Sequence, residues 1–296
     1  MGCFCLTDGR MFLFVSTVPM PFSFKISPLV LAGTIVVVLG LICDAVIIAR
    51  FLPAPNYRVS PKPWGGRALL ISVLMLAGLI VLANGCYALL ATLQHTRNVF
   101  KLAAIVLPSE LFLRVGVLAG FVVYFRRCRI LLRPALGLDA MPLGVAAGWG
   151  VLFCLASLPP VGAIIFATNA FCRLFHISIA DQPIIDLFLT IHSPVLLVTL
   201  LIFAISVAPV FEEFLFRGFA YPVLKQRFGL GKAWLLVAAV FALSHWHAPS
   251  FLPLFVFALG LGLAYELTGS LVAPITMHAL FNTTMILQIF YQRSHP

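Results

Sequence analysis

Long apolar stretches, joined by short segments that hold most of the basic residues, constrain this chain more than any other feature. Of its 296 residues, 62% are hydrophobic and only 9% are charged. A soluble domain has about a quarter charged residues, whereas a membrane-spanning helix needs roughly 20 mainly apolar residues. The sequence therefore excludes an ordinary cytosolic protein and predicts an all-α, polytopic bundle of helices in lipid.

The apolar stretches predict about eight transmembrane helices. Residues 1–27 form an irregular N-terminal segment, residues 28–190 hold the first helices, with no assigned role, and residues 191–292 hold the candidate catalytic helices. The sixth and seventh helices are short, so one of them could be tilted, broken or partly re-entrant. The predicted spans are 29–51, 68–93, 109–125, 143–171, a fifth that starts at Pro194 and passes through Glu212, 233–246, 252–267 and 271–291.

The net charge of +10 does not indicate a nucleic-acid partner. The basic residues lie between the apolar stretches, where a membrane protein places its anchors, so the predicted partner is the lipid bilayer. Two pairs of small residues, Gly144 with Gly148 and Ala258 with Gly262, have the spacing that allows close helix packing.

Ionisable residues within the spans are candidates for function, because a charge in the bilayer core costs a few kcal/mol. Glu110 and Arg114 are four residues apart and predict a structural ion pair near a helix start, with Ser109 as the N-cap. Glu266 is expected at the membrane surface. The remaining candidates cluster between residues 212 and 282, and are Glu212, Glu213, Arg217, His245, His278 and Asn282.

Helix geometry divides the two adjacent glutamates. Successive residues point about 100° apart, so Glu212 and Glu213 should have different partners. Arg217 lies four residues after Glu213 and predicts a salt bridge with it, which leaves Glu212 for chemistry. Pro209, one turn earlier, predicts a kink that opens room for water. Three helices are expected to bring Glu212 together with both histidines and Asn282.

These residue types leave several functions open. A carboxylate in a low dielectric can act as a base near neutral pH, a histidine can relay a proton, and a second histidine with an asparagine can stabilise an oxyanion. The set could also bind zinc, although the chain has no His-Glu-x-x-His motif. A non-hydrolytic scaffold, or an ion- or proton-coupled transporter, could use the same Glu/His cluster.

Three short motifs occur in order in this region. They read Glu212-Glu213-Phe-Leu-Phe-Arg217, Phe241-Ala-Leu-Ser-His245 and His278-Ala-Leu-Phe-Asn282. Together they resemble the Glu-Glu-x-x-x-Arg, Phe-x-x-x-His and His-x-x-x-Asn motifs of the CPBP (ABI) family of CAAX proteases and bacteriocin-processing enzymes. The resemblance covers roughly residues 195–290.

The resemblance implies an intramembrane endopeptidase of the glutamate type, which needs no cofactor. Glu212 would activate water with help from His245, and His278 and Asn282 would form the oxyanion hole. Glu213 and Arg217 would support the site. The implied substrate is a peptide or protein in or at the membrane, and a bacterial cytoplasmic membrane is the expected location. Metal-dependent hydrolysis is the mechanistic alternative.

Overall fold

The computed structural model describes residues 28–51, 59, 62–66, 70, 99–177, 183–191 and 193–294. The chain divides into two units, residues 1–35 and 36–296. Of the first unit, the described part is the beginning of the first helix. The second unit holds every other feature described below, including all the candidate site residues.

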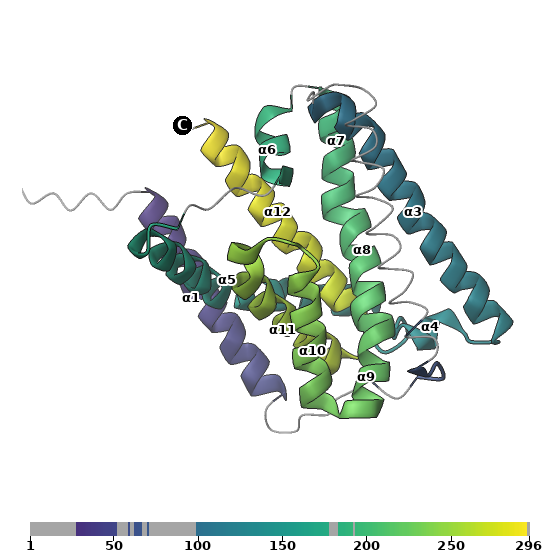
Figure 1. The fold of residues 1–296 in the computed structure, drawn as a ribbon. Helices are drawn as coiled ribbons and strands as arrows, with labels where there is room; N and C mark the ends of the chain where they lie inside the picture. Colours follow the sequence, from purple (N-terminus) through teal and green to yellow (C-terminus); the bar gives the residue numbers. More distant parts are fainter. Residues whose placement is uncertain are drawn as a thin grey trace, which may run out of the picture. The chain divides into compact units, whose positions relative to one another are not determined.

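The described residues form helices and no strands. Figure 1 shows them labelled in chain order. The helices are α1 (Pro28–Phe51), α3 (Val99–Arg127), α4 (Leu132–Ala135), α5 (Leu143–Leu174), α6 (Pro183–Thr190), α7 (Pro194–Ile202), η1 (Phe203–Val207), α8 (Ala208–Glu213), η2 (Phe214–Ala220), α9 (Tyr221–Phe228), α10 (Leu230–Leu243), η3 (Ala248–Ser250), α11 (Phe251–Thr268) and α12 (Val272–Ser294).

Five helical stretches of the described chain are long and apolar enough to cross a membrane. They confirm the all-α, multi-pass prediction, although not the count of eight. The predicted span 68–93 lies outside the described residues. The shorter helix α10 is also apolar. The five stretches are Gly33–Phe51, Leu143–Leu174, Pro194–Phe228, Ala248–Thr268 and Val272–Tyr291.

Two π-helical segments, η1 and η2, interrupt the long helix from α7 to α9, which we call the motif helix. η1 ends two residues before Pro209, and η2 ends two residues before Pro222. A proline has no N–H and its ring crowds the carbonyl four residues earlier, so a wider π turn suits the residues before it. Figure 1 shows α7, α8 and α9 continuing one another. The kink predicted at Pro209 stays a prediction, and the structure shows a π segment before this proline.

The ion pair of Arg114 with Glu110 is confirmed, but its predicted place near a helix start is wrong. Helix α3 begins at Val99, so Ser109 is not an N-cap and Pro108 lies inside the helix. The apolar residues before Pro108 are good enough helix formers to extend the helix through it. The Arg114 guanidinium lies over the Phe211 ring, 5.4 Å from its centroid. The pair therefore contacts the motif helix.

Glu266, which the sequence predicted at the membrane surface, belongs to a second buried polar cluster. Its side chain is 3% exposed. Oε1 accepts hydrogen bonds from the hydroxyl of Tyr221 at 2.7 Å and from Nζ of Lys225 at 2.6 Å. Lys225 Nζ also donates to the carbonyl of Val59 at 3.0 Å. The cluster fixes the end of α9 against α11 and the segment that contains Val59.

Trp64 anchors that same segment to η2. It is 1% exposed, stacks on Phe219 with ring centroids 5.4 Å apart, and donates from Nε1 to the Phe219 carbonyl at 3.2 Å. A buried tryptophan normally needs a partner for its N–H, and this carbonyl provides it. Trp64, which follows α1 in the chain, thus packs against Phe219, two residues after Arg217 in the sequence.

Close helix packing uses glycines, though not all of the predicted ones. A Cβ at Gly262 would lie 2.6 Å from Trp234, which confirms close packing around the Ala258–Gly262 pair. No described atom lies within 4 Å of a Cβ built at Gly144 or Gly148. On α5 it is Gly150 that makes the close contact, because its Cβ would lie 2.5 Å from the carbonyl oxygen of Ala273 on α12.

Gly150 and Gly148, both on α5, give a matched test of this packing. We expect Gly150→Ala to lower the free energy of unfolding by roughly 1–3 kcal/mol, because the added methyl meets backbone rather than a movable side chain. Gly148→Ala should be neutral or slightly stabilising, since alanine favours helix. Thermal unfolding in detergent would measure both variants. Equal midpoints would show that α5 and α12 are not packed as described.

Candidate active site

Glu213 and Arg217 form a buried ion pair at the junction of α8 and η2. Their side chains are 0% and 1% exposed, and Arg217 NH1 donates to Glu213 Oε1 at 2.9 Å. The second guanidinium nitrogen, NH2, donates to the carbonyl of Ala258 on α11 at 3.1 Å. The guanidinium also lies 4.6 Å from the ring centroid of Phe241 on α10. The predicted salt bridge is confirmed, and Arg217 joins three helices.

His278 on α12 reaches both glutamates. Its Nδ1 lies 2.8 Å from Glu213 Oε1, and its Nε2 lies 4.0 Å from Glu212 Oε2. An ionised carboxylate only accepts hydrogen bonds, so Nδ1 carries the proton and a neutral imidazole presents a lone pair on Nε2. The prediction of separate partners is therefore wrong in this respect. The glutamates point in different directions, but one imidazole lies between them, with Nδ1 bonded to Glu213 and Nε2 facing Glu212.

Exposure distinguishes the two carboxylates. The Glu212 side chain is 21% exposed, whereas that of Glu213 is fully buried. Within the described part of the chain, Glu212 Oε2 is buried and has no hydrogen-bond partner. A buried polar atom normally has a partner, often water. Glu212 can thus meet water, while Glu213 is held by Arg217 and His278.

His245 lies in the turn after α10, where the sequence predicted a helix to about residue 246. Its Nδ1 lies 2.8 Å from the carbonyl of Phe241, and Ser244 Oγ donates to the same carbonyl at 2.7 Å. These two side chains satisfy a carbonyl at the end of the helix, so α10 stops at Leu243. A carbonyl only accepts, so Nδ1 of His245 is protonated. Among the contacts of the described residues, none joins His245 to Glu212.

Asn282 lies one turn after His278 on α12, as its spacing predicted. Its Nδ2 donates to the backbone carbonyl of Ala204 in η1 at 2.8 Å. The asparagine therefore contacts the motif helix through the backbone. No contact in the described structure joins it to Glu212.

A family comparison covers this region. Residues 194–284 match the model of the family described as Type II CAAX prenyl endopeptidase Rce1-like. This segment of the chain is Rce1-like. The match confirms the resemblance to CPBP proteases and, with the apolar helices, supports an intramembrane endopeptidase in a multi-pass membrane protein. Comparisons with curated proteins and with solved structures gave no match.

The Rce1-like segment runs from the start of α7 into α12, so it includes all six candidate residues. Two further residues of this segment were missed as participants. Phe241 supplies the carbonyl that orients His245, and its ring lies 5.7 Å from the ring of His278. Ala258 supplies a carbonyl to Arg217. The motif pattern pointed to Phe241 and the small-residue pair to Ala258, but neither signal indicates a backbone contact.

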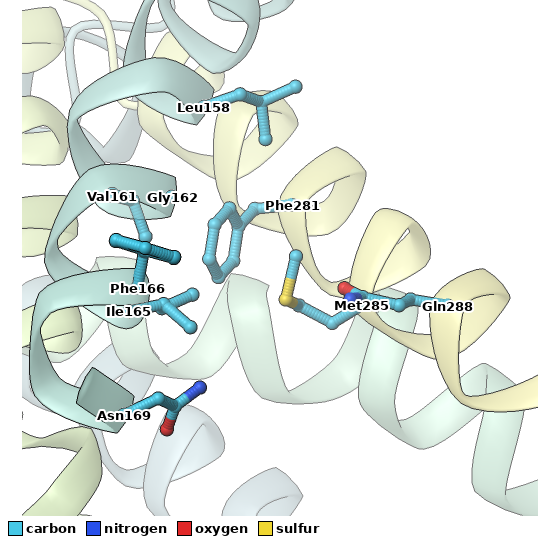
Figure 2. Close-up of a pocket in the computed structure, with 9 residues that line it drawn as sticks. All are labelled: Leu158, Val161, Gly162, Ile165, Phe166, Asn169, Phe281, Met285 and Gln288. Atoms are coloured by element: carbon cyan, nitrogen blue, oxygen red, sulfur yellow. The ribbon is translucent and has the colours of Figure 1, made fainter. Parts of the chain in front are cut away.

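A cavity of about 310 Å³ lies between α5 and α12. Figure 2 shows Phe281 and Met285 of α12 facing Val161 and Gly162 of α5 across it. None of the six candidate residues lines it. Phe281 stacks on Phe257 with ring centroids 3.9 Å apart, and Phe257 in turn contacts the His278 ring at 5.6 Å. Contacts between aromatic rings therefore connect the wall of this cavity to the histidine.

The Rce1-like segment holds carboxylates and imidazoles, which are the ligand types that zinc uses. Among the described residues, no group of three or more His, Cys, Asp or Glu side chains is arranged so that it could hold a metal ion.

The Glu213–Arg217 pair should dominate the stability of this region. We expect Arg217→Met to lower the free energy of unfolding by about 3–5 kcal/mol, because it leaves the buried Glu213 carboxylate without its counter-ion. Arg227→Met, at an exposed position of α9, should change it little. Unfolding in detergent would compare the two variants. An equal loss in both would mean that the buried pair contributes nothing specific.

Proposed function

We propose that this chain is an intramembrane endopeptidase in which Glu212 activates the water that cleaves a peptide bond. One observation supports this most directly. The partly exposed Glu212 carboxylate has a buried oxygen with no partner among the described residues, and this oxygen faces Nε2 of His278 across 4.0 Å. The Rce1-like match supports the same class of reaction.

The hydrogen-bond chemistry of this gap favours a water molecule. The Glu212 carboxylate and the unprotonated Nε2 of a neutral His278 are both acceptors, so they cannot bond to each other. A water oxygen at about 2.8 Å from each atom fits beside a gap of this width and can donate one proton to each side. A water held by two acceptors is polarised toward hydroxide. His278 is therefore the histidine that the described contacts favour as the partner of Glu212.

The reaction step follows from this arrangement. The water oxygen would form a bond with the carbonyl carbon of the substrate peptide while its proton passes to the Glu212 carboxylate. The C–N bond would then break, and the proton would pass from Glu212 to the departing amine. Glu213 and Arg217 would not exchange protons with substrate. Their role would be to fix the tautomer and direction of His278.

The roles of His245 and Asn282 follow from the resemblance. His245 is the proposed helper of Glu212, and Asn282 is a residue to which the resemblance gives the oxyanion role. The resemblance gives His278 the same role, but a neutral His278 whose one proton lies on Nδ1 has no N–H to donate there. The bond from His245 Nδ1 to the Phe241 carbonyl supports a role for its Nε2 in accepting a proton. Asn282 donates an amide N–H to the Ala204 carbonyl, so the resemblance is what supports an oxyanion role for it.

The proposed substrate is a peptide or protein held in or at the membrane. The motif helix and α12, which carry Glu212 and His278, are both apolar enough to span a bilayer. The family description reads CAAX prenyl endopeptidase, so a farnesylated CAAX peptide is the first substrate to try and the same peptide without farnesyl is its control. We place the protein in a bacterial cytoplasmic membrane, in keeping with the resemblance to bacteriocin-processing enzymes.

Glu212→Gln tests the proposal. We expect it to lower cleavage by at least about 100-fold, because the general base is lost, while the unfolding midpoint stays close to that of the parent. Asp44→Asn, a carboxylate change on α1, should leave cleavage unaffected. Proteomics of host membranes that carry the parent or the Glu212→Gln protein would reveal uncleaved substrates. Undiminished cleavage by Glu212→Gln would rule out the mechanism.

The glutamate mechanism also predicts that metal removal has no effect. Cleavage should persist after exhaustive chelation, and metal analysis of the purified active protein should find no stoichiometric zinc. Loss of cleavage on chelation, with recovery when one divalent metal is restored, would favour the metal-dependent alternative.

A further inference from the structure

Asn282 donates to a carbonyl that the helix itself cannot satisfy. In η1 the backbone N–H of Ala208 donates to Phe203, five residues earlier. The next donor in this π pattern would be residue 209, whose N–H would reach Ala204. Residue 209 is a proline and has no N–H. The amide of Asn282 occupies the oxygen of Ala204 instead, at 2.8 Å.

Such a bond has a clear energetic basis. Ala204 and Asn282 are both partly buried. A carbonyl left without a donor in an apolar surrounding costs more than an ordinary hydrogen bond is worth, because its desolvation is not compensated. Pro209 therefore creates a requirement on the motif helix, and a side chain of α12 meets it.

The bond also bears on the direction of Glu212. η1 leads directly into α8, and one residue more or less in a helix turns everything after it by about 100°. The register of η1 therefore sets which way Glu212 faces. Asn282 contacts η1, and one turn earlier on α12 His278 contacts Glu213 of α8. Helix α12 therefore contacts the motif helix at two points along its length.

We propose that Asn282 is a positioning residue, which supplies the hydrogen bond that Pro209 withholds from Ala204 and so keeps Glu212 opposite His278. The effect of Asn282 on cleavage rests on the proposed function. Its hydrogen bond to Ala204 does not. This positioning role differs from the oxyanion role that the resemblance implies, since here Asn282 acts on the motif helix rather than on substrate.

A thermodynamic cycle tests the structural part. Asn282→Ala should lower the unfolding midpoint by roughly 2–6 °C, since it leaves the Ala204 carbonyl unpaired. In a Pro209→Ala background the same change should cost less than half as much. Alanine at 209 restores an N–H, so Ala204 gains a backbone donor, from residue 209 in a π pattern or from residue 208 in an α pattern. Pro222→Ala is the matched control background, where Asn282→Ala should keep its full cost.

A second cycle, on cleavage of the farnesylated CAAX peptide, tests the positioning role. In the parent protein, Asn282→Ala should lower kcat more than 10-fold. In the Pro209→Ala background, the same change should lower kcat less than 3-fold relative to Pro209→Ala alone. A group that donates to the oxyanion would lose the same factor in both backgrounds. A residue with only a structural role would alter the midpoint and leave kcat per folded molecule unchanged.

The outcomes separate cleanly. Coupling between positions 209 and 282 in both stability and kcat supports the inference. Equal effects of Asn282→Ala in the parent and Pro209→Ala backgrounds overturn it, as does coupling in stability without rescue of kcat. Failure of the proposed function appears elsewhere, as full cleavage by Glu212→Gln or as no cleavage by the parent. The stability cycle needs no cleavage and decides the structural part in either case.

Discussion

The buried pair of Glu213 and Arg217 is the interaction on which the rest of the site depends. Arg217 reaches the Ala258 carbonyl on α11 and lies over the Phe241 ring on α10, while Glu213 holds His278 on α12. Four helices thus converge on one charge pair in an apolar protein. A pair of this kind adds little net stability when compared with apolar packing, but breaking it is costly. Its effect here is to fix one arrangement of the helices.

That arrangement leaves a second carboxylate, Glu212, outside the buried pair. Arg217 balances the charge of Glu213, and His278 donates the second hydrogen bond that Glu213 Oε1 accepts. Glu212, next in the chain but about 100° around the helix, lies outside this network and keeps some exposure. The buried pair orients the imidazole, and the imidazole in turn faces Glu212. The proposed mechanism therefore assigns structure and chemistry to adjacent residues, in keeping with their geometry on a helix.

Much of the fold could be predicted from the sequence, because apolar length alone indicates a membrane helix. The salt bridge of Glu213 with Arg217 also follows from spacing on one helix. Contacts across helices were harder. Spacing could not show that His278 lies between both glutamates, or that His245 contacts the backbone of its own helix. The His278 contacts depend on the packing of side chains from different helices, which periodicity does not encode. The His245 contact depends on where α10 ends.

Two prolines of the motif helix link its local sequence to its tertiary contacts. Pro209 and Pro222 each follow a π-helical segment, and carbonyls of these two segments accept bonds from distant side chains, Asn282 at η1 and Trp64 at η2. In a straight α-helix each of those carbonyls would pair with a backbone N–H, which leaves one lone pair for a neighbour. The irregular turns therefore give other parts of the chain polar points of attachment inside an apolar bundle. This links the position of two prolines to the way in which the motif helix is held, and so to the direction of its glutamates.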